Sequence, residues 1–203
     1  INNLLNGLYG ASNLLLRGKN IEKYSEIIHN LSERLIKEVE VQKMISTHTA
    51  STSLQKAEIS TETILNEVRS FYHQHCALEN KQLEVSVEQL AGKVYSDFSL
   101  LLRVLCNMIT NALEASSGGD VVNVWVTTCS DRAIFHVHNN QTIAEKVQLR
   151  LFEKNFSTKT GDGRGLGTYS MKLIGEKLLG GKVQFTTSES EGTTFTLSLP
   201  LAV

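Results

Sequence analysis

The 203-residue sequence lacks an excess of charge of either sign, which limits the partners that it can bind. It has 20 Lys and Arg residues against 21 Asp and Glu residues, a formal net charge of −1 at pH 7. Proteins that bind nucleic acid usually carry a basic patch or stripe, and the sequence shows no basic tract. Nucleic acid is therefore not an expected partner, and any site for an anion must be built locally.

Long hydrophobic runs and paired cysteines are also missing. No run reaches the roughly 18 apolar residues of a membrane span, and no signal peptide is visible. Cys76, Cys106 and Cys129 are scattered, with no Cys-x-x-Cys pair, which is typical of reduced thiols in the cytosol. We expect a cytoplasmic chain without direct membrane contact. Because it starts at Ile1 in mid-pattern, we expect it to be a piece of a longer protein. A sensor or membrane segment could precede Ile1 in that protein.

Residues 1–47 are predicted to form a helical hairpin. Apolar residues recur with helical spacing from Leu4 to Leu16, and a second periodic run extends from Tyr24 to Ile45. Gly18 lies just past the first run, where glycine commonly ends a helix. Isolated helices of this length are marginal. The leucine-rich hairpin is therefore predicted to form a four-helix bundle as a homodimer, the alternative being that it packs on its own chain.

Residues 48–57, polar and without periodicity at their start, are expected to be a linker to a second domain, residues 58–203. The pattern in this domain is mixed. Helices are predicted at 61–77, at 98–115 with Asp97 as N-cap, and at 168–179. Strands are predicted at 82–87, 93–96, 121–129, 133–138, 182–187 and 193–199. The fold class is therefore α+β, an α/β sandwich with helices on one face of a mostly antiparallel sheet.

Two polar features of this domain are candidates for chemistry. Asn107, Asn111 and Glu114 are three and four residues apart, so they align on one face of a helix. Amide and carboxylate oxygens in a row suit a hydrated Mg²⁺ that carries phosphate; a solvated polar face is the alternative. The glycine-rich stretch GDGRGLG, Gly161 to Gly167, runs into a predicted helix. Such a loop offers backbone N–H groups to phosphate, although many glycine-rich loops are plain connectors.

In their order along the chain, these pieces resemble the GHKL ATP-binding fold, and specifically that of sensor histidine kinases. NMITNALEAS (Asn107 to Ser116) resembles the N box, and LFEKNFSTK (Leu151 to Lys159) resembles the F box of the ATP lid. GDGRGLGTYSMK resembles the G2 box, and EGTTFTLSLP (Glu191 to Pro200) resembles the closing G3 strand. The hairpin before them resembles the dimerisation and histidine-phosphotransfer module of the same kinases.

The resemblance implies that Asn111 coordinates Mg²⁺ bridging the ATP phosphates, with Asn107 one turn earlier assisting. Hydrolytic GHKL enzymes, such as gyrases and Hsp90-type chaperones, place a glutamate base at the earlier site. Asparagine cannot take a proton from water, which favours phosphoryl transfer to a side chain over ATP hydrolysis. A GHKL ATPase is therefore a disfavoured interpretation.

The resemblance also implies contacts between the lid and ATP. Lys159 and Arg164 would meet phosphate oxygens, and Thr193 or Thr194 would lie near the adenine. The G2 residues that would let the backbone approach the nucleotide are Gly163, Gly165, Leu166 and Gly167. Phe152 and Phe156 would anchor the lid on the domain.

The G1 box departs from the family pattern, which is Asp-x-Gly-x-Gly. Here HNNQTI (His138 to Ile143) has no glycine and one residue fewer, and Asn139 stands where an aspartate would accept a hydrogen bond from the adenine amino group. An amide oxygen can accept that bond but carries no charge. We expect weakened or altered nucleotide binding; a degenerate domain that binds none is the alternative.

The sequence also departs from the phosphoacceptor motif of histidine kinases, H-(D/E)-x-x-(N/T). Ile1-Asn2-Asn3 fits its end, with Asn3 at the last position, so the histidine would lie two residues before Ile1. None of the six histidines present is a good substitute. His136 and His138 share one face of a predicted strand, but a metal site would need a third ligand.

The sequence thus predicts the catalytic core of a two-component sensor histidine kinase, a homodimer that binds Mg·ATP. Asn3 and Asn107 are the predicted catalytic residues, and the γ-phosphoryl group would pass to a hairpin histidine. An aspartate on a response-regulator receiver would then accept it. The alternative is a non-catalytic histidine phosphotransferase or scaffold with a degenerate nucleotide-binding domain.

Overall fold

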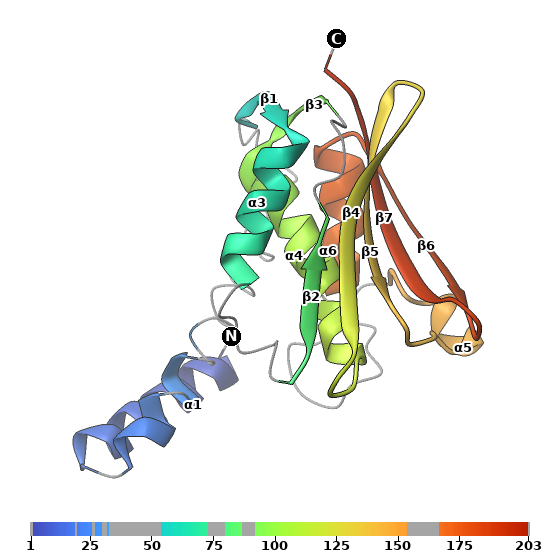
Figure 1. The fold of residues 1–203 in the computed structure, drawn as a ribbon. Coiled ribbons are helices and arrows are strands. Elements are labelled where there is room, and N and C mark those ends of the chain that lie inside the picture. Colours follow the sequence, from blue (N-terminus) through green and yellow to red (C-terminus); the bar gives the residue numbers. More distant parts are fainter. Residues whose placement is uncertain are drawn as a thin grey trace. The chain divides into compact units, whose positions relative to one another are not determined.

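The structure is a computed structural model of the 203-residue chain. It describes residues 2–18, 20–25, 27–29, 32, 54–72, 80–86, 92–153 and 167–202. The chain divides into two compact units, Ile1–Ser53 and Leu54–Val203. Helix α1 belongs to the first unit, and all other labelled elements belong to the second (Figure 1).

The first unit contains helix α1 (Asn2–Leu16), which confirms the first predicted helix. It ends at a turn in which Gly18 has a φ of 70°, a conformation that glycine adopts without steric cost. Residues 21–25 and 27–29 are helical again, and Oδ1 of Asn20 accepts a hydrogen bond from the backbone N–H of Lys23 at 3.3 Å, as an N-cap does. The rest of the predicted second helix and residues 48–53 of the linker lie outside the described residues, so the full hairpin stays a prediction.

The second unit is built on a five-stranded sheet with the strand order β2-β4-β5-β7-β6. Its strands are β2 (Gln82–Val85), β4 (Val121–Cys129), β5 (Arg132–Asn139), β6 (Lys182–Ser188) and β7 (Gly192–Pro200). Only the β2–β4 pair is parallel, and the other three pairs are antiparallel. All five strands were predicted, so the mostly antiparallel sheet is confirmed.

A separate two-stranded antiparallel sheet joins β1 (Lys56–Ser60) to β3 (Lys93–Asp97). β3 was predicted, but β1 was not. Three of the five residues of its sequence, KAEIS, are exposed and only Ile59 is buried, so the strand has no clear hydrophobic alternation from which to recognise it.

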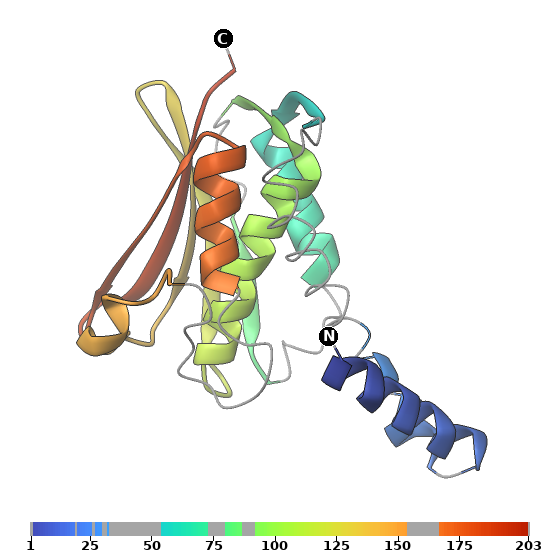
Figure 2. The ribbon, with the colours of Figure 1, turned by 180° about the vertical axis from the view of Figure 1, so that it is seen from behind.

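Helices cover one face of the five-stranded sheet (Figures 1 and 2). They are α3 (Thr61–Tyr72), α4 (Phe98–Ala115) and α6 (Gly167–Lys172), which continues as the π-helix η3 (Leu173–Leu178). A short helix, α5 (Glu145–Gln148), lies near the ends of β6 and β7. Helices on one face of an antiparallel sheet are the α+β arrangement that the sequence predicts.

α4 is the central helix of this layer, and its bounds are those predicted. Oδ1 of Asp97 accepts a hydrogen bond from the N–H of Leu100 at 3.1 Å, which confirms the N-cap. Its buried residues are Leu101, Val104, Leu105, Met108, Ile109, Ala112 and Leu113. By length and apolar composition alone, α4 is the single described helix that could cross a membrane. In this domain its apolar face packs on α6 and β5, and burying each large side chain contributes about 1.5–3 kcal/mol to stability.

The last predicted helix, 168–179, is present but widens into a π-helix after Lys172. Gly175 lies on the sheet so closely that an added Cβ would come within 2.5 Å of Cγ2 of Val183 and 3.1 Å of Cδ1 of Leu197. The N–H of Leu179 bonds to the carbonyl of Ile174 at 2.9 Å, a spacing of five residues. The wider turn is a packing feature and leaves no mark in hydrophobic periodicity.

Candidate functional site

The site begins with two asparagines in the C-terminal half of α4. Asn107 and Asn111 are half-buried, and their neighbours Met108 and Ala112 are fully or almost fully buried. The two polar side chains therefore lie at the border of the core, one helical turn apart. Because α4 also packs on β5 and α6, this border faces other elements of the domain.

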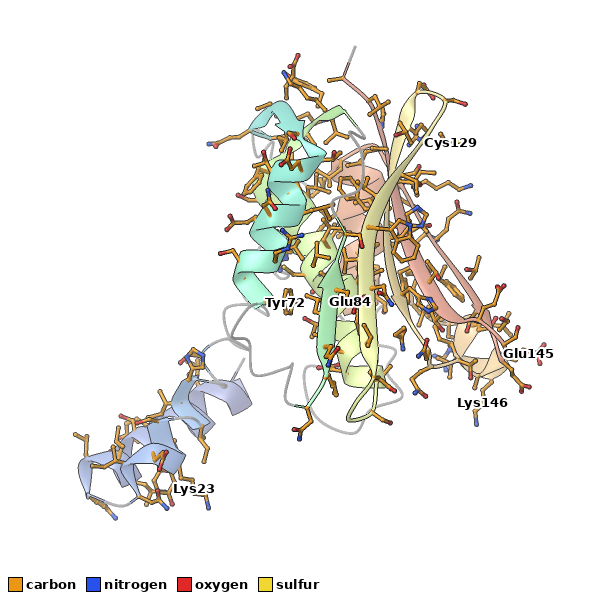
Figure 3. The ribbon with its side chains drawn as sticks, viewed as in Figure 1. Lys23, Tyr72, Glu84, Cys129, Glu145 and Lys146 are labelled. Carbon is orange, nitrogen blue, oxygen red and sulfur yellow. The ribbon has the colours of Figure 1, made fainter. Side chains whose placement is uncertain are left out.

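Helix α3 supports the turns of α4 that carry these asparagines. The hydroxyl of Tyr72, at the end of α3 (Figure 3), donates a hydrogen bond to the carbonyl of Cys106 at 3.1 Å. It also lies 2.9 Å from Oγ1 of Thr110. Cys106 and Thr110 each directly precede one of the two asparagines, so a buried tyrosine holds the rotation of α4 at both turns. The sequence analysis predicted this helix but did not predict the hydrogen bonds that the hydroxyl of Tyr72 makes with α4.

α6 begins beside Asn111. A Cβ added to Gly167 would lie 3.7 Å from Oδ1 and 4.0 Å from Nδ2 of Asn111. The first residue of the glycine-led helix is thus in van der Waals range of the asparagine on α4, although the two are far apart in the sequence. The structure therefore brings together one residue of the predicted metal site and one residue of the predicted phosphate loop.

Asn139 ends β5 on the face that the helices cover. Side chains alternate along β5, so the buried residues Ala133, Phe135, Val137 and Asn139 share that face. Asn139 is 3% exposed and is paired in register with Thr193 of β7, which is 1% exposed. The Nδ2 atom of Asn139 is buried and has no hydrogen-bond partner among the described residues. This end of β5, the C-terminal end of α4 and the start of α6 lie at the same end of the domain (Figures 1 and 2).

Thr193 ties the chain that follows β5 to the sheet. Its Oγ1 donates a hydrogen bond to the carbonyl of Gln141 at 2.7 Å and lies 2.8 Å from Oγ1 of Thr187. Thr187 in turn accepts a hydrogen bond from the N–H of Ile143 at 3.1 Å. Residues 141–143 belong to the segment in which the sequence lacks the expected glycines, and these bonds hold it against β6 and β7.

Gly192 is a further site residue, one that the sequence analysis missed. It has a φ of 70°, and an added Cβ would lie 2.7 Å from Cα of Asn140 and would also overlap the carbonyl oxygen of Asn139. Only glycine accepts both this backbone conformation and this close approach. The signal that could have revealed it is the glycine that immediately precedes Thr193 at the start of the last predicted strand.

Thr194, the alternative to Thr193 in the predictions, lies on the opposite face of the sheet. Its Oγ1 is 3.1 Å from Nδ1 of His138. On the same face His136 stacks on Trp125, with ring centroids 4.7 Å apart, and its Nε2 is 2.8 Å from Oγ1 of Thr127. Burial lowers the pKa of His136. In the described part of the chain, no group of three His, Cys, Asp or Glu residues gathers that could hold a metal ion.

The described residues include only the start of the predicted lid. Phe152 packs on β6, with its ring centroid 5.9 Å from that of Phe185, and Nζ of Lys172 lies 5.1 Å from the centroid of Phe152. Five residues predicted to contact ATP lie outside the described residues: Lys159, Gly163, Arg164, Gly165 and Leu166. Phe156, the second predicted anchor of the lid, lies outside them as well. Asn3 lies within α1, and the structure does not describe its side chain.

Residues 96–203, just over half of the chain, match the protein family described as "Histidine kinase-, DNA gyrase B-, and HSP90-like ATPase". The chain belongs to this family. The matched range contains α4, four of the five strands of the large sheet, and α6, so both asparagines of α4, Asn139, Gly167 and Thr193 lie within the ATPase domain.

Relatives of this ATPase domain include the histidine protein kinase SaeS of Staphylococcus epidermidis, which is 27% identical over 150 residues that cover 70% of this chain and 42% of SaeS. The chain therefore spans less than half the length of that relative. Among solved structures, the catalytic domain of histidine kinase ThkA is similar with a TM-score of 0.61 and 26% identity, over 72% of this chain and 95% of the ThkA chain. The predicted resemblance to a histidine kinase core with a GHKL ATP-binding domain is confirmed.

Two further structures show the same fold at lower identity. ShkA in complex with AMPPNP has a TM-score of 0.76 and 21% identity, over 98% of this chain and 43% of ShkA. ThkA has also been solved in complex with the response regulator protein TrrA, with a TM-score of 0.67 and 20% identity, over 99% of this chain and 59% of that chain.

Proposed function

We propose that this chain is the core of an ATP-dependent protein-histidine kinase in a two-component phosphorelay. The observation that carries the proposal is the approach of Gly167 to Asn111, where a Cβ added to the glycine would lie 3.7 Å from Oδ1. It joins an amide oxygen on α4 to the start of a glycine-led helix, where backbone N–H groups are free to bind phosphate. Membership of the ATPase family and the AMPPNP-bound fold of ShkA support ATP as the ligand.

The residues at this end of α4 fit a magnesium ion. Asn107 and Asn111 offer amide oxygens, which suit a hard cation that retains water and phosphate ligands. Gly167 lies beside Asn111, where an added Cβ would already be in van der Waals contact with the amide, 3.7 Å from Oδ1. When bound there, Mg²⁺ would neutralise part of the negative charge of the phosphates.

Asn107 favours transfer over hydrolysis. Its amide can hold a water molecule or a phosphate oxygen by hydrogen bonds, but it cannot act as a general base for attack by water. The γ-phosphoryl group therefore passes from ATP to an imidazole nitrogen of a histidine, which gives up its proton, and ADP leaves. We place this histidine two residues before Ile1, and Asn3 would position it. An aspartate of a response-regulator receiver accepts the phosphoryl group next, and the solved complex of ThkA with TrrA supports this kind of partner. We place the reaction in the cytoplasm, where ATP is available.

The decisive test uses this chain extended at its N-terminus so that it contains the proposed histidine. Incubation with Mg·ATP is expected to give a phosphoryl group that is stable in base and labile in acid, as phosphohistidine is. Adding a receiver domain should move the label to an aspartate. Binding of ATP without any phosphohistidine would contradict the kinase proposal and favour the non-catalytic scaffold.

We also propose that the first unit forms a homodimer through α1. Leu5, Tyr9 and Leu16 are 46%, 73% and 82% exposed, and their spacing of four and seven residues places them on one face of the helix. Such a stripe of large apolar side chains is typical of a surface that another helix covers.

The variant Leu5→Glu should shift the chain from dimer to monomer, because it places a charge in the apolar stripe. Light scattering coupled to size-exclusion chromatography measures the change directly. Arg17→Glu, at an exposed position past the end of α1, is the control and should leave the mass unchanged. A wild-type chain that remains monomeric at high micromolar concentration would disprove the dimer.

A further inference from the structure

Asn139 has an unusual hydrogen-bonding state. In the part of the chain that the structure describes, two buried side-chain polar atoms lack a partner, Oγ of Ser96 and Nδ2 of Asn139. Ser96 belongs to the separate two-stranded sheet, whereas Asn139 lies at the end of the domain that holds Asn111 and Gly167. A buried donor without an acceptor is unfavourable. The amide of Asn139 is therefore a donor that is available to a ligand at this end of the domain.

The backbone around Asn139 is fixed independently of any ligand. Its neighbour in the sheet, Thr193, bonds to the carbonyl of Gln141 at 2.7 Å. Gln141 extends its Nε2 to Oδ2 of Asp120 at 3.2 Å, and Gly192 lies against Asn140 with no room for a Cβ. The amide is thus presented from a rigid strand end, and the freedom that remains to it is rotation of the side chain.

The two purine bases differ at the group that such an amide can contact. Adenine carries an amino group at C6, which donates, and guanine carries a carbonyl there, which accepts. A carboxylate can only accept, so it pairs with adenine and repels guanine O6. An asparagine amide carries a donor and an acceptor, and a half-turn about its last torsion exchanges them. The orphan Nδ2 of Asn139 is the donor that a guanine carbonyl needs.

We propose that Asn139 determines the nucleobase selectivity of this site and lets it bind GTP as well as ATP. This inference rests on the proposed function, since it requires a nucleotide at the site. Nδ2 donates to O6 of guanine, and in the rotated amide Oδ1 accepts from the amino group of adenine. Both bases gain one hydrogen bond, so the dissociation constants of the two nucleotides should lie within about tenfold of each other.

The test measures binding of Mg·AMPPNP and Mg·GMPPNP to the 203-residue chain by titration calorimetry. The key variant, Asn139→Asp, has an acceptor only. We expect it to raise the preference for the adenine nucleotide by about 5- to 150-fold, the range set by one unmade buried hydrogen bond. The matched control is Asn140→Asp, which makes the same chemical change one residue later at an exposed position and should leave the ratio unchanged.

A third variant tests the side-chain amide of Asn139 without adding a charge. Asn139→Ala removes both donor and acceptor and should weaken both nucleotides while leaving their ratio near that of the wild type. Asn111→Ala should weaken both as well, which shows that they share the phosphate site. Urea unfolding of each variant verifies that it is folded at the temperature of the titration.

The outcomes separate this inference from the proposed function. A wild-type chain that prefers AMPPNP by more than about 100-fold, with the same ratio in Asn139→Asp, overturns the inference and leaves the kinase proposal intact. A wild-type chain that binds neither nucleotide overturns both. Comparable affinities in the wild type together with a raised adenine preference in Asn139→Asp, and no change in Asn140→Asp, establish Asn139 as the selectivity residue.

Discussion

Replacing Asn111 with alanine is expected to weaken Mg·ATP binding by about 10- to 150-fold. One oxygen contact to a charged group contributes about 1.5–3 kcal/mol, which corresponds to that range of affinity. The effect should be large because Asn111 is half-buried beside the start of α6, and alanine offers no oxygen to the metal. Titration calorimetry with and without Mg²⁺ measures the loss and assigns it to the metal.

The matched control for this variant is Asn123→Ala. Asn123 is also half-buried, but it lies on β4 opposite His138, on the face of the sheet that the helices leave uncovered. It should bind Mg·ATP as the wild type does. Equal affinities of Asn111→Ala and Asn123→Ala would mean that α4 does not hold the metal and would remove the main support for the site.

Gly192→Ala is expected to destabilise the ATPase domain by about 2–5 kcal/mol. A non-glycine residue at positive φ costs about 1–2 kcal/mol, and forcing a methyl group into a filled space costs about 1–3 kcal/mol. The overlap falls on the backbone of Asn140, at 2.7 Å, which cannot rotate away as the end of a side chain can. Urea denaturation followed by circular dichroism gives the change in the free energy of unfolding.

Gly180→Ala separates the two contributions. Gly180 has a φ of 71°, close to the 70° of Gly192, but an added Cβ there meets nothing within 4 Å. This control should cost only the conformational part, about 1–2 kcal/mol. If the two variants lose the same stability, the close contact between Gly192 and the segment after β5 is not a packing constraint. The segment would then need another explanation for its order.

The limits of α4 could be predicted to the residue because its signals are local. Asp97 lies at the N-cap, the apolar face has a helical period, and Ser116 follows the last helical residue. The hairpin of β4 and β5 was predictable for the same reason, since both strands alternate between the two faces of the sheet. The order of the strands and the parallel β2–β4 pair depend on contacts between distant segments, which periodicity does not report.

In the candidate site, too, the features with local sequence signals could be predicted, and the contacts between distant segments could not. Asn107 and Asn111 were found from their spacing on one helix, and their assignment to Mg²⁺ and ATP came from the resemblance to histidine kinases. The approach of Gly167 to Asn111 and the orphan Nδ2 of Asn139 are consequences of packing. The role of Gly192 also depends on packing, because the sequence shows a glycine before Thr193 but not its close approach to Asn140. The altered segment after β5 lacks the expected glycines, yet Thr193 and Thr187 hold it by hydrogen bonds that only the folded sheet brings together.

The most direct test of the nucleotide site, on which the kinase proposal depends, is a calorimetric titration of the 203-residue chain with Mg·ATP. We expect saturable binding with a dissociation constant between micromolar and millimolar, and loss of that binding when Mg²⁺ is removed with a chelator. Such a result would show that the nucleotide site functions with Asn139 in place of an acidic residue. Absence of binding at millimolar Mg·ATP would contradict the account and leave a degenerate, non-catalytic module on the same fold.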